Sequence, residues 1–147
     1  MEDAGSFIRR LYDAEVESRR KGGCSPLSTA RHRRHYLSAT LAAACDRDEV
    51  RREAGLEAGF WFDPLTGEGG DPASAVIHIV NPEAETVLAE VALTANDARF
   101  VIHFVLVRTK MGWRIDDIDS KDWMGSVAYR FAARDLATSL GVRTRRL

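Results

Sequence analysis

The first third of the chain carries its apolar residues at the spacing of an amphipathic helix. Phe7, Ile8 and Leu11 share one side of such a helix, with arginine and glutamate between the apolar positions. Residues three and four apart lie on the same helix face, so the pattern predicts a helix over residues 4–21. Gly22-Gly23 is expected to end it, because glycine readily adopts the left-handed conformation that follows a helix.

Two further helices are predicted before the pattern changes. Ser28 is a candidate N-cap for a second helix that runs to about Cys45. Asp46 and Glu49 have the spacing of a capping box. This spacing predicts a short third helix that begins at Asp46 and that Gly55 ends.

From residue 75 the apolar residues alternate with a period of two, which is typical of β-strands. Turn-like segments of three residues join these runs, and such short links require antiparallel neighbours. The stretch before them, residues 60–73, is rich in glycine, proline and aromatic residues and is predicted to be irregular. A final helix is predicted from Ser126 to Leu140, with a frayed tail over about 141–147. The predicted strands cover residues 75–80, 87–94, 100–108 and 113–118.

Hairpin pairing sorts the strand side chains onto two faces, and a slip of one residue would exchange the faces of a whole strand. Both faces are largely apolar, whereas a face in water should carry polar residues. The second face therefore needs a cover: a homodimer partner, which we favour, or a helix that crosses the sheet. The first face is predicted to hold Ile77, Ile79, Leu88, Ala92, Ile102, Phe104, Leu106, Trp113 and Ile115. The second is predicted to hold Val76, His78, Val80, Ala89, Val91, Val101, His103, Val105, Val107, Arg114, Asp116 and Ile118.

Composition limits the classes of protein without selecting one. The 147 residues favour a single domain over 1–147, with a core large enough to fold without a disulfide or a metal. The net charge of −1 does not indicate nucleic acid or an anionic membrane as a partner. No apolar run approaches the roughly 20 residues of a membrane span. Cys24 and Cys45 are predicted to be free, partly buried thiols, because a helix would hold them too far apart to bond.

The first residues, Met1 to Gly5, lack the basic start and the apolar core of a signal peptide. As the chain reads, we expect it to be cytoplasmic. A mature exported protein that had been given a starting methionine would have the same sequence, so a periplasmic or exported location stays open.

Four segments, which cover most of residues 6–125, resemble the NTF2-like (cystatin-like α+β) superfamily. Within it, the chain looks most like the bacterial DUF3828 family of uncharacterised, frequently exported proteins. The segments are Leu27-Ser28 with Leu37-Ser38 and Leu41, Phe62-Asp63-Pro64-Leu65-Thr66-Gly67 with Asp71, Gly112-Trp113-Arg114-Ile115-Asp116-Asp117-Ile118, and the helix start beyond. The resemblance implies a cone-shaped α+β fold with a pocket between the first helices and a curved antiparallel sheet. The superfamily includes isomerases, dehydratases, transport factors and binding domains, so the fold alone does not select a function.

The pocket that the resemblance implies has four aromatic candidates at its mouth, Tyr12, Tyr36, Trp61 and Phe62. Aromatic side chains commonly form the apolar walls of ligand sites. The alternative is that these side chains belong to the core.

Three ionisable residues fall on the first, otherwise apolar face: Glu90, Arg108 and Asp117. Arg108 and Asp117 are placed to form an ion pair at the end of the sheet. Burial would raise the pKa of Glu90 and suit it to acid–base chemistry. Glu90 and Arg108 are therefore candidate residues of the pocket on this face. The alternative for Glu90 is a position in water at the edge of the cone.

On the second face, His103 and Asp116 could form a pair in which the carboxylate orients the imidazole as a general base. His78 lies on the same face, two strands or roughly 10 Å from His103, which is too far for one shared metal. The alternative is that both histidines are partly buried sheet residues with local partners. The chain lacks phosphate-loop, nucleophile-elbow, Cys-x-x-Cys and His-Glu-x-x-His motifs.

The sequence therefore predicts a dimeric NTF2-like domain without cofactor or metal. Its expected function is non-enzymatic binding, either of a small apolar molecule in the cone or of a protein partner on the surface. The alternatives are a small isomerase or dehydratase that uses Glu90 or the His103–Asp116 pair as base, and a structural dimer module.

Overall fold

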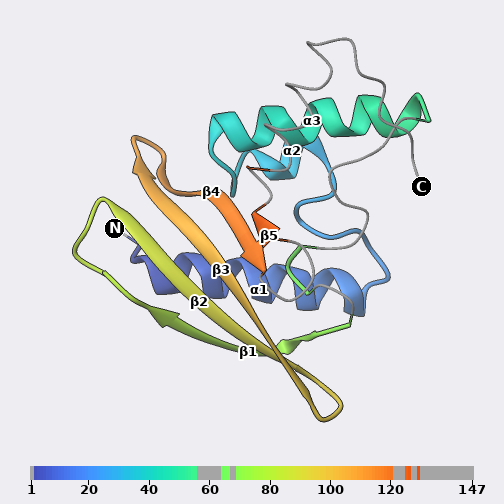
Figure 1. Cartoon of the computed structure of the whole chain (residues 1–147). Coiled ribbons are helices and arrows are strands. Elements are labelled where there is room, and N and C mark those ends of the chain that lie inside the picture. Colours follow the sequence, from blue (N-terminus) through green and yellow to red (C-terminus); the bar gives the residue numbers. More distant parts are fainter. Residues whose placement is uncertain (1, 56–63, 67–68, 121–124, 127–128, 130–147) are drawn as a thin grey trace.

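The computed structural model describes residues 2–55, 64–66, 69–120, 125–126 and 129, in which helices precede a curved antiparallel sheet (Figure 1). The strand order is β1-β2-β3-β4-β5. This confirms the predicted α+β class. Of the predicted C-terminal helix only Ser126, which ends β5, and Tyr129 are described; the rest of that helix and the predicted frayed tail lie outside the described residues. The helices are α1 (Ala4–Arg20), α2 (Ala30–Arg33) and α3 (Ala39–Glu53). The strands are β1 (Asp71–Ile79), β2 (Thr86–Ala95), β3 (Ala98–Thr109), β4 (Gly112–Ser120) and β5 (Gly125–Ser126).

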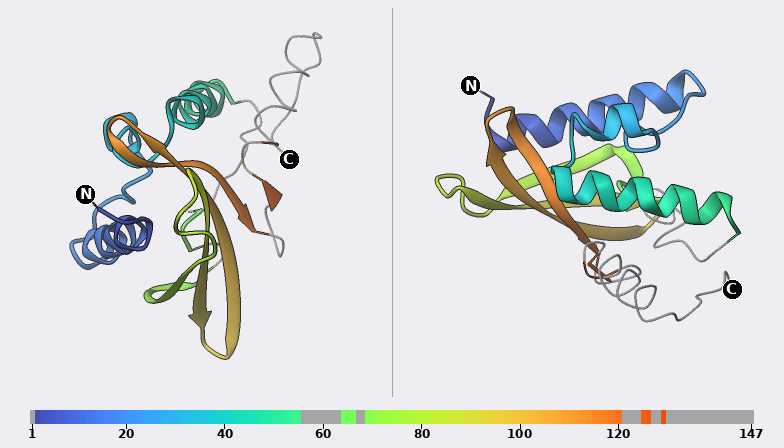
Figure 2. Two further views of the ribbon diagram at one scale, coloured as in Figure 1. Left: turned by 90° about the vertical axis from the view of Figure 1, so that its left-hand side faces the viewer. Right: turned by 90° about the horizontal axis from the view of Figure 1, so that it is seen from above.

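The first helix has the ends and the buried stripe that the sequence predicts. Asp3 caps its start by accepting a hydrogen bond from the backbone N–H of Ser6 at 2.7 Å, which lowers the pKa of the Asp3 carboxyl. Gly22, with a φ of 70°, follows its end. Phe7 is fully buried, and α1 lies along one face of the sheet against β1 and β2 (Figure 2).

The predicted second helix is wrong, because the chain breaks at a strand-like segment between α2 and α3. Here the N–H of Ile115 in β4 donates to the carbonyl of Tyr36 at 2.7 Å, and the N–H of Ser38 donates back to the carbonyl of Ile115 at 2.8 Å. The Ser38 side chain then caps α3, accepting from the N–H of Leu41 at 3.2 Å. The first turn of the next helix therefore begins at Ala39.

The predicted helix start at Asp46 is wrong for a related reason. The helix α3 runs without interruption from Ala39 to Glu53. Asp46 and Glu49 point their carboxylates at Arg33 of α2 instead of capping a new helix. The capping-box spacing thus marks two acids on one helix face, which is also compatible with a helix interior.

The side chains of the sheet that face α1 form the core together with the helices. Phe104 at its centre is fully buried and meets the ring of Tyr12 edge-on, with centroids 6.2 Å apart. Ile77 and Ile79 pack against the same core at its margin. The buried sheet residues are Pro72, Ala75, Val87, Ala89, Val91, Leu93, Ile102, Phe104, Leu106, Trp113, Ile115 and Ile118.

Strand β2 faces the opposite way from the prediction. The register pairs Val91 with Ile102 and Ala89 with Phe104, so Val91 and Ala89 point inward, while Leu88 and Ala92 point outward. The cause is the β2–β3 turn, in which Ala95 pairs with Ala98 across two residues rather than three. A shift of one residue exchanges every side chain of a strand between the two faces.

A bulge in β4 produces the other error in the face assignment. Leu106 pairs with Ile115, but the preceding residue, Val105, pairs with Asp117, so Asp116 is an extra residue in β4. Beyond a bulge the alternation changes phase. Ile118 therefore pairs with Phe104 and is buried, instead of lying on the second face as predicted.

The two cysteines are free thiols in different surroundings. Cys24 is exposed, which differs from the predicted partial burial, whereas Cys45 of α3 is buried. Burial raises the pKa of the Cys45 thiol to about 12. Because the thiolate is the reactive form, Cys45 is a packing residue of the core.

Candidate functional site

The candidate interaction surface is the side of the sheet opposite α1, which we call the outer face. Its side chains on β2 and β3 are mostly apolar and partly buried, and Val76 on β1 is 66% exposed. Figure 2 shows no described helix on this side of β2 and β3. The outward residues of β2 and β3 are Leu88, Glu90, Ala92, Val101, His103, Val105 and Val107.

One row of ionisable side chains crosses this apolar surface from strand to strand. The register aligns His78 of β1 with Glu90 of β2, Glu90 with His103 of β3, and His103 with Asp119 of β4. Glu90 Oε1 and His103 Nε2 lie 3.1 Å apart, at hydrogen-bond distance. These four residues are called the outer-face row, and basic-type and acidic side chains alternate along it.

Glu90 does not lie on the predicted first face of the sheet, and its neighbours differ from the predicted ones. The turn that reverses β2 places Glu90 on the outer face, whereas Arg108 lies on the α1 side of the sheet. Asp117 pairs with Val105, so it also lies on the outer face and not on the first face as predicted. Arg108 does not pair with Asp117; its guanidinium lies 4.7 Å from the centre of the Trp113 ring. The Asp117 carboxylate accepts a hydrogen bond from the Ser126 hydroxyl at 2.5 Å.

The predicted pair of His103 and Asp116 is also wrong. The β4 bulge sets Asp119 opposite His103. Asp116 instead accepts a hydrogen bond from the Ser38 hydroxyl at 2.8 Å and so joins the start of α3 to the sheet. In the described structure Asp116 therefore positions the start of α3 against β4.

The aromatic candidates for the pocket mouth have different positions. Tyr12 is 1% exposed and donates its hydroxyl hydrogen to the Leu65 carbonyl at 2.8 Å, which makes it a core residue. Tyr36 is partly buried, and the guanidinium of Arg10 lies 5.4 Å from its ring centre. Trp61 and Phe62 lie outside the described residues.

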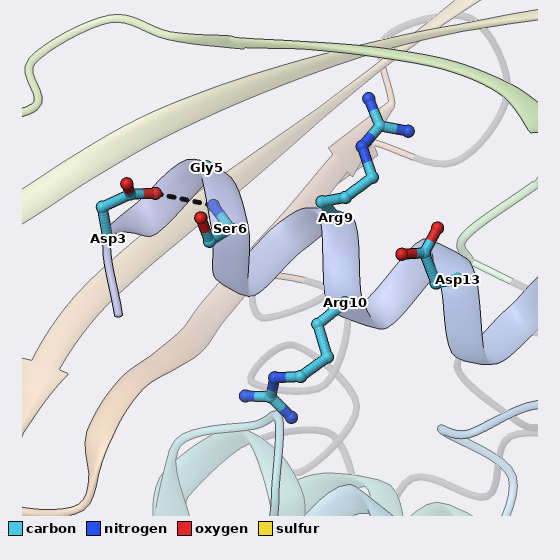
Figure 3. A pocket seen from close by; sticks show the side chains of 6 residues that line it. All are labelled: Asp3, Gly5, Ser6, Arg9, Arg10 and Asp13. Atoms are coloured by element: carbon cyan, nitrogen blue, oxygen red, sulfur yellow. Dashed lines mark hydrogen bonds between the residues drawn. The ribbon is translucent and has the colours of Figure 1, made fainter. Parts of the chain in front are cut away.

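A shallow cavity of about 470 Å³ runs along the start of α1 (Figure 3). Arg9 and Arg10 point to opposite sides of the helix in this view. Arg9 donates to the Ala75 carbonyl at 3.1 Å, and Arg10 pairs with Glu2 at 3.0 Å, which raises the pKa of Arg10. Because the two guanidinium groups point apart and have partners in the chain, they do not converge on a common ligand position.

A smaller cavity of about 230 Å³ lies between the start of α1 and the sheet. Ile79, Pro82 and Trp113 supply apolar lining, and Arg108 supplies a cation. Trp113 is 3% exposed, and its indole Nε1 has no hydrogen-bond partner among the described residues. Arg108, a predicted pocket residue, thus lines a cavity, although that cavity does not include Glu90.

A buried ion cluster joins α2 to α3 and was not expected from the sequence. The Arg33 side chain is 4% exposed and lies 2.7 Å from Glu49 Oε1 and 2.8 Å from Asp46 Oδ1. Burial opposes its charged form, but the hydrogen bonds that Arg33 donates to Glu49 and Asp46 outweigh burial and raise the pKa of Arg33. In the sequence, Arg33 lies within the basic run Arg31-His32-Arg33-Arg34-His35, whose composition is typical of a solvated helix face.

The described part of the chain offers little that resembles a catalytic or metal site. No three His, Cys, Asp or Glu side chains among the described residues come close enough to hold a metal ion. Glu90 and His103 are within hydrogen-bond reach of each other, but neither lines the two cavities above. The outer-face row is therefore better placed to meet another surface than to enclose a substrate.

Comparisons with protein-family models, with curated proteins and with solved structures found no match to this chain. Within the described ranges, every helix is too short or too polar to cross a membrane. The function of the chain is therefore inferred from the geometry of the outer face.

Proposed function

We propose that this chain is a non-enzymatic binding domain that associates with a protein, a second copy of itself, through the outer face. The observation that carries the proposal is the apolar character of β2 and β3 on the side away from α1. A sheet face in water should alternate to polar residues, and contiguous exposed apolar surface marks interaction sites. The order of helices before a curved sheet supports an NTF2-like assignment as a further proposal.

The size of the outer face predicts a weak, reversible dimer. Strands of this length extend for about 30 Å, and four neighbouring strands span about 15 Å. The footprint is then about 450 Å² on each copy, below the roughly 800 Å² of a standard interface. We therefore expect dissociation in the micromolar range.

Val105→Asp tests this proposal, because Val105 is on the outer face of the central strand β3. Association would bury the new carboxylate among apolar side chains, which should weaken the dimer at least about 30-fold. The measurement is a set of ¹H–¹⁵N spectra of the wild type and the variant over a range of protein concentrations. In the wild type, amide signals of β2 and β3 should move with concentration, and in the variant they should not.

The matched control is Val50→Asp, the same substitution on α3 at a valine that is 66% exposed. Its spectra should keep the concentration dependence of the wild type. Concentration-dependent signals confined to other elements, or none at all, would contradict the proposal.

A second candidate function is the binding of a small apolar or aromatic molecule in the cavity beside Trp113. It is favoured by the apolar lining of that cavity and by the cation of Arg108 at its wall. Native mass spectrometry under gentle conditions should then show an additional mass that is lost on denaturation. The bare mass of the polypeptide under both conditions would argue against a co-purified ligand.

A further inference from the structure

We infer that the second copy docks on the outer face with a twofold axis that runs parallel to the strands, between β2 and β3. Each acidic residue of the outer-face row then faces a histidine of the second copy, and each histidine faces an acidic residue. This inference rests on the proposed function and adds the arrangement of the partner. It starts from the order of the outer-face row, His78, Glu90, His103 and Asp119.

Rotation about an axis parallel to the strands reverses the order of the strands in the second copy. Glu90 then faces His103 of the partner subunit, and His78 faces Asp119 of the partner subunit. Every residue of the row meets a group of complementary type, because an imidazole can donate a hydrogen bond to a carboxylate. The same surface patch serves both copies, as an isologous interface requires.

The apolar side chains of β2 and β3 obey the same symmetry. Leu88 and Val105 are cross-strand partners, as are Ala92 and Val101. Reversal of the strand order therefore places leucine against valine, and alanine against valine, across the interface. The outer-face row and the apolar side chains of β2 and β3 thus favour one common arrangement.

An axis across the strands, along the row, would have the opposite effect. It would place each row residue against its own copy, so that Glu90 faces Glu90 of the partner subunit. Opposed carboxylates in a partly desolvated interface repel, and such contacts select against an arrangement. The order of the row therefore discriminates between the two ways of stacking the faces.

The two arrangements differ most at the β2–β3 turn, which contains Asn96 and the exposed Asp97. The turn lies seven residues beyond Glu90 along the strand, or about 24 Å. With the axis parallel to the strands, the turns of the two copies lie at the same end. Sheets stack about 10 Å apart and cross at about 30°, so labels on the turns should be less than about 30 Å apart. With the axis across the strands, the turns lie at opposite ends, about 50 Å apart.

The test is a double electron–electron resonance measurement on Asp97→Cys in a Cys24→Ser background, with a nitroxide on the introduced thiol. Cys45 is buried and is not expected to take the label. We expect a distance below about 30 Å that disappears when Val105→Asp is added. A distance near 50 Å that also disappears with Val105→Asp would overturn this arrangement and leave the proposed function standing. If an intermolecular distance persists in Val105→Asp, both the arrangement and the proposed function are overturned. The same holds if no intermolecular distance is found because the chain stays monomeric.

Glu90→Lys tests the contribution of the row itself. It would face His103 of the partner subunit with a cation and lose the hydrogen bond, so association should weaken at least about 10-fold. Glu53→Lys makes the same charge change at an exposed site on α3 and should leave association unchanged. Equal association of both variants would overturn the role assigned to the row.

Discussion

Val91→Asp is expected to abolish the cooperative unfolding transition of the chain. Val91 is fully buried in β2, between Ile77 of β1 and Ile102 of β3. A carboxylate there has no cation or donor in the apolar core, so the free energy of unfolding should fall by at least about 4 kcal/mol. That loss approaches the whole stability of many small domains. Far-UV circular dichroism during thermal unfolding, at a concentration that favours the monomer, measures the effect.

Ala92→Asp is the matched control, because the next residue of β2 points to the outer face and is only partly buried. The new carboxylate stays hydrated there, and the free energy of unfolding should change by less than about 1 kcal/mol. A cooperative transition in Val91→Asp together with its loss in Ala92→Asp would show that β2 has the opposite register.

Arg33→Ala is expected to lower the free energy of unfolding by about 3 kcal/mol. The guanidinium is 4% exposed, bonds Asp46 and Glu49 of α3, and donates to the Leu27 carbonyl at 3.2 Å. Its removal breaks the link between α2 and α3 and leaves a void where the side chain packs. The two carboxylates are about 40% exposed and can regain hydration, which keeps the loss at the lower end for a buried ion pair.

Denaturant unfolding measures this loss, with Arg34→Ala as the control. Arg34 is the exposed neighbour and the C-cap of α2, so its truncation should cost less than about 0.5 kcal/mol. Equal losses in the two variants would show that the Arg33 cluster does not stabilise the fold.

Long periodic patterns predict the helices and strands of this fold. A difference of one residue in the length of a turn decides on which face of the sheet the side chains of a strand lie. The alternation in β1 and β3 places Ile77, Phe104 and His103 correctly. In β2 the same alternation leads to the wrong face, because a turn of three residues was expected where Asn96 and Asp97 make a turn of two. Asn96, with a φ of 54°, is the type of residue that such short turns favour, and this was the available sequence signal.

Some residues of the candidate site could likewise be placed from the sequence pattern, and others could not. An apolar second face with His78 and His103 follows from strand alternation, and the structure confirms their placement. The positions of Glu90 and Asp119 depend on the β2–β3 turn and on the β4 bulge. A bulge adds one residue without a pattern that distinguishes it in a single sequence, so the complete row required the structure.

The most direct test of the central claim is sedimentation equilibrium of the unmodified chain from about 5 to 500 μM, a range that brackets a weak interface. If the outer face binds a second copy, the mean mass should rise with concentration from that of the monomer toward that of the dimer. Dilution should reverse the change. A mass equal to that of the monomer at every concentration would contradict the account.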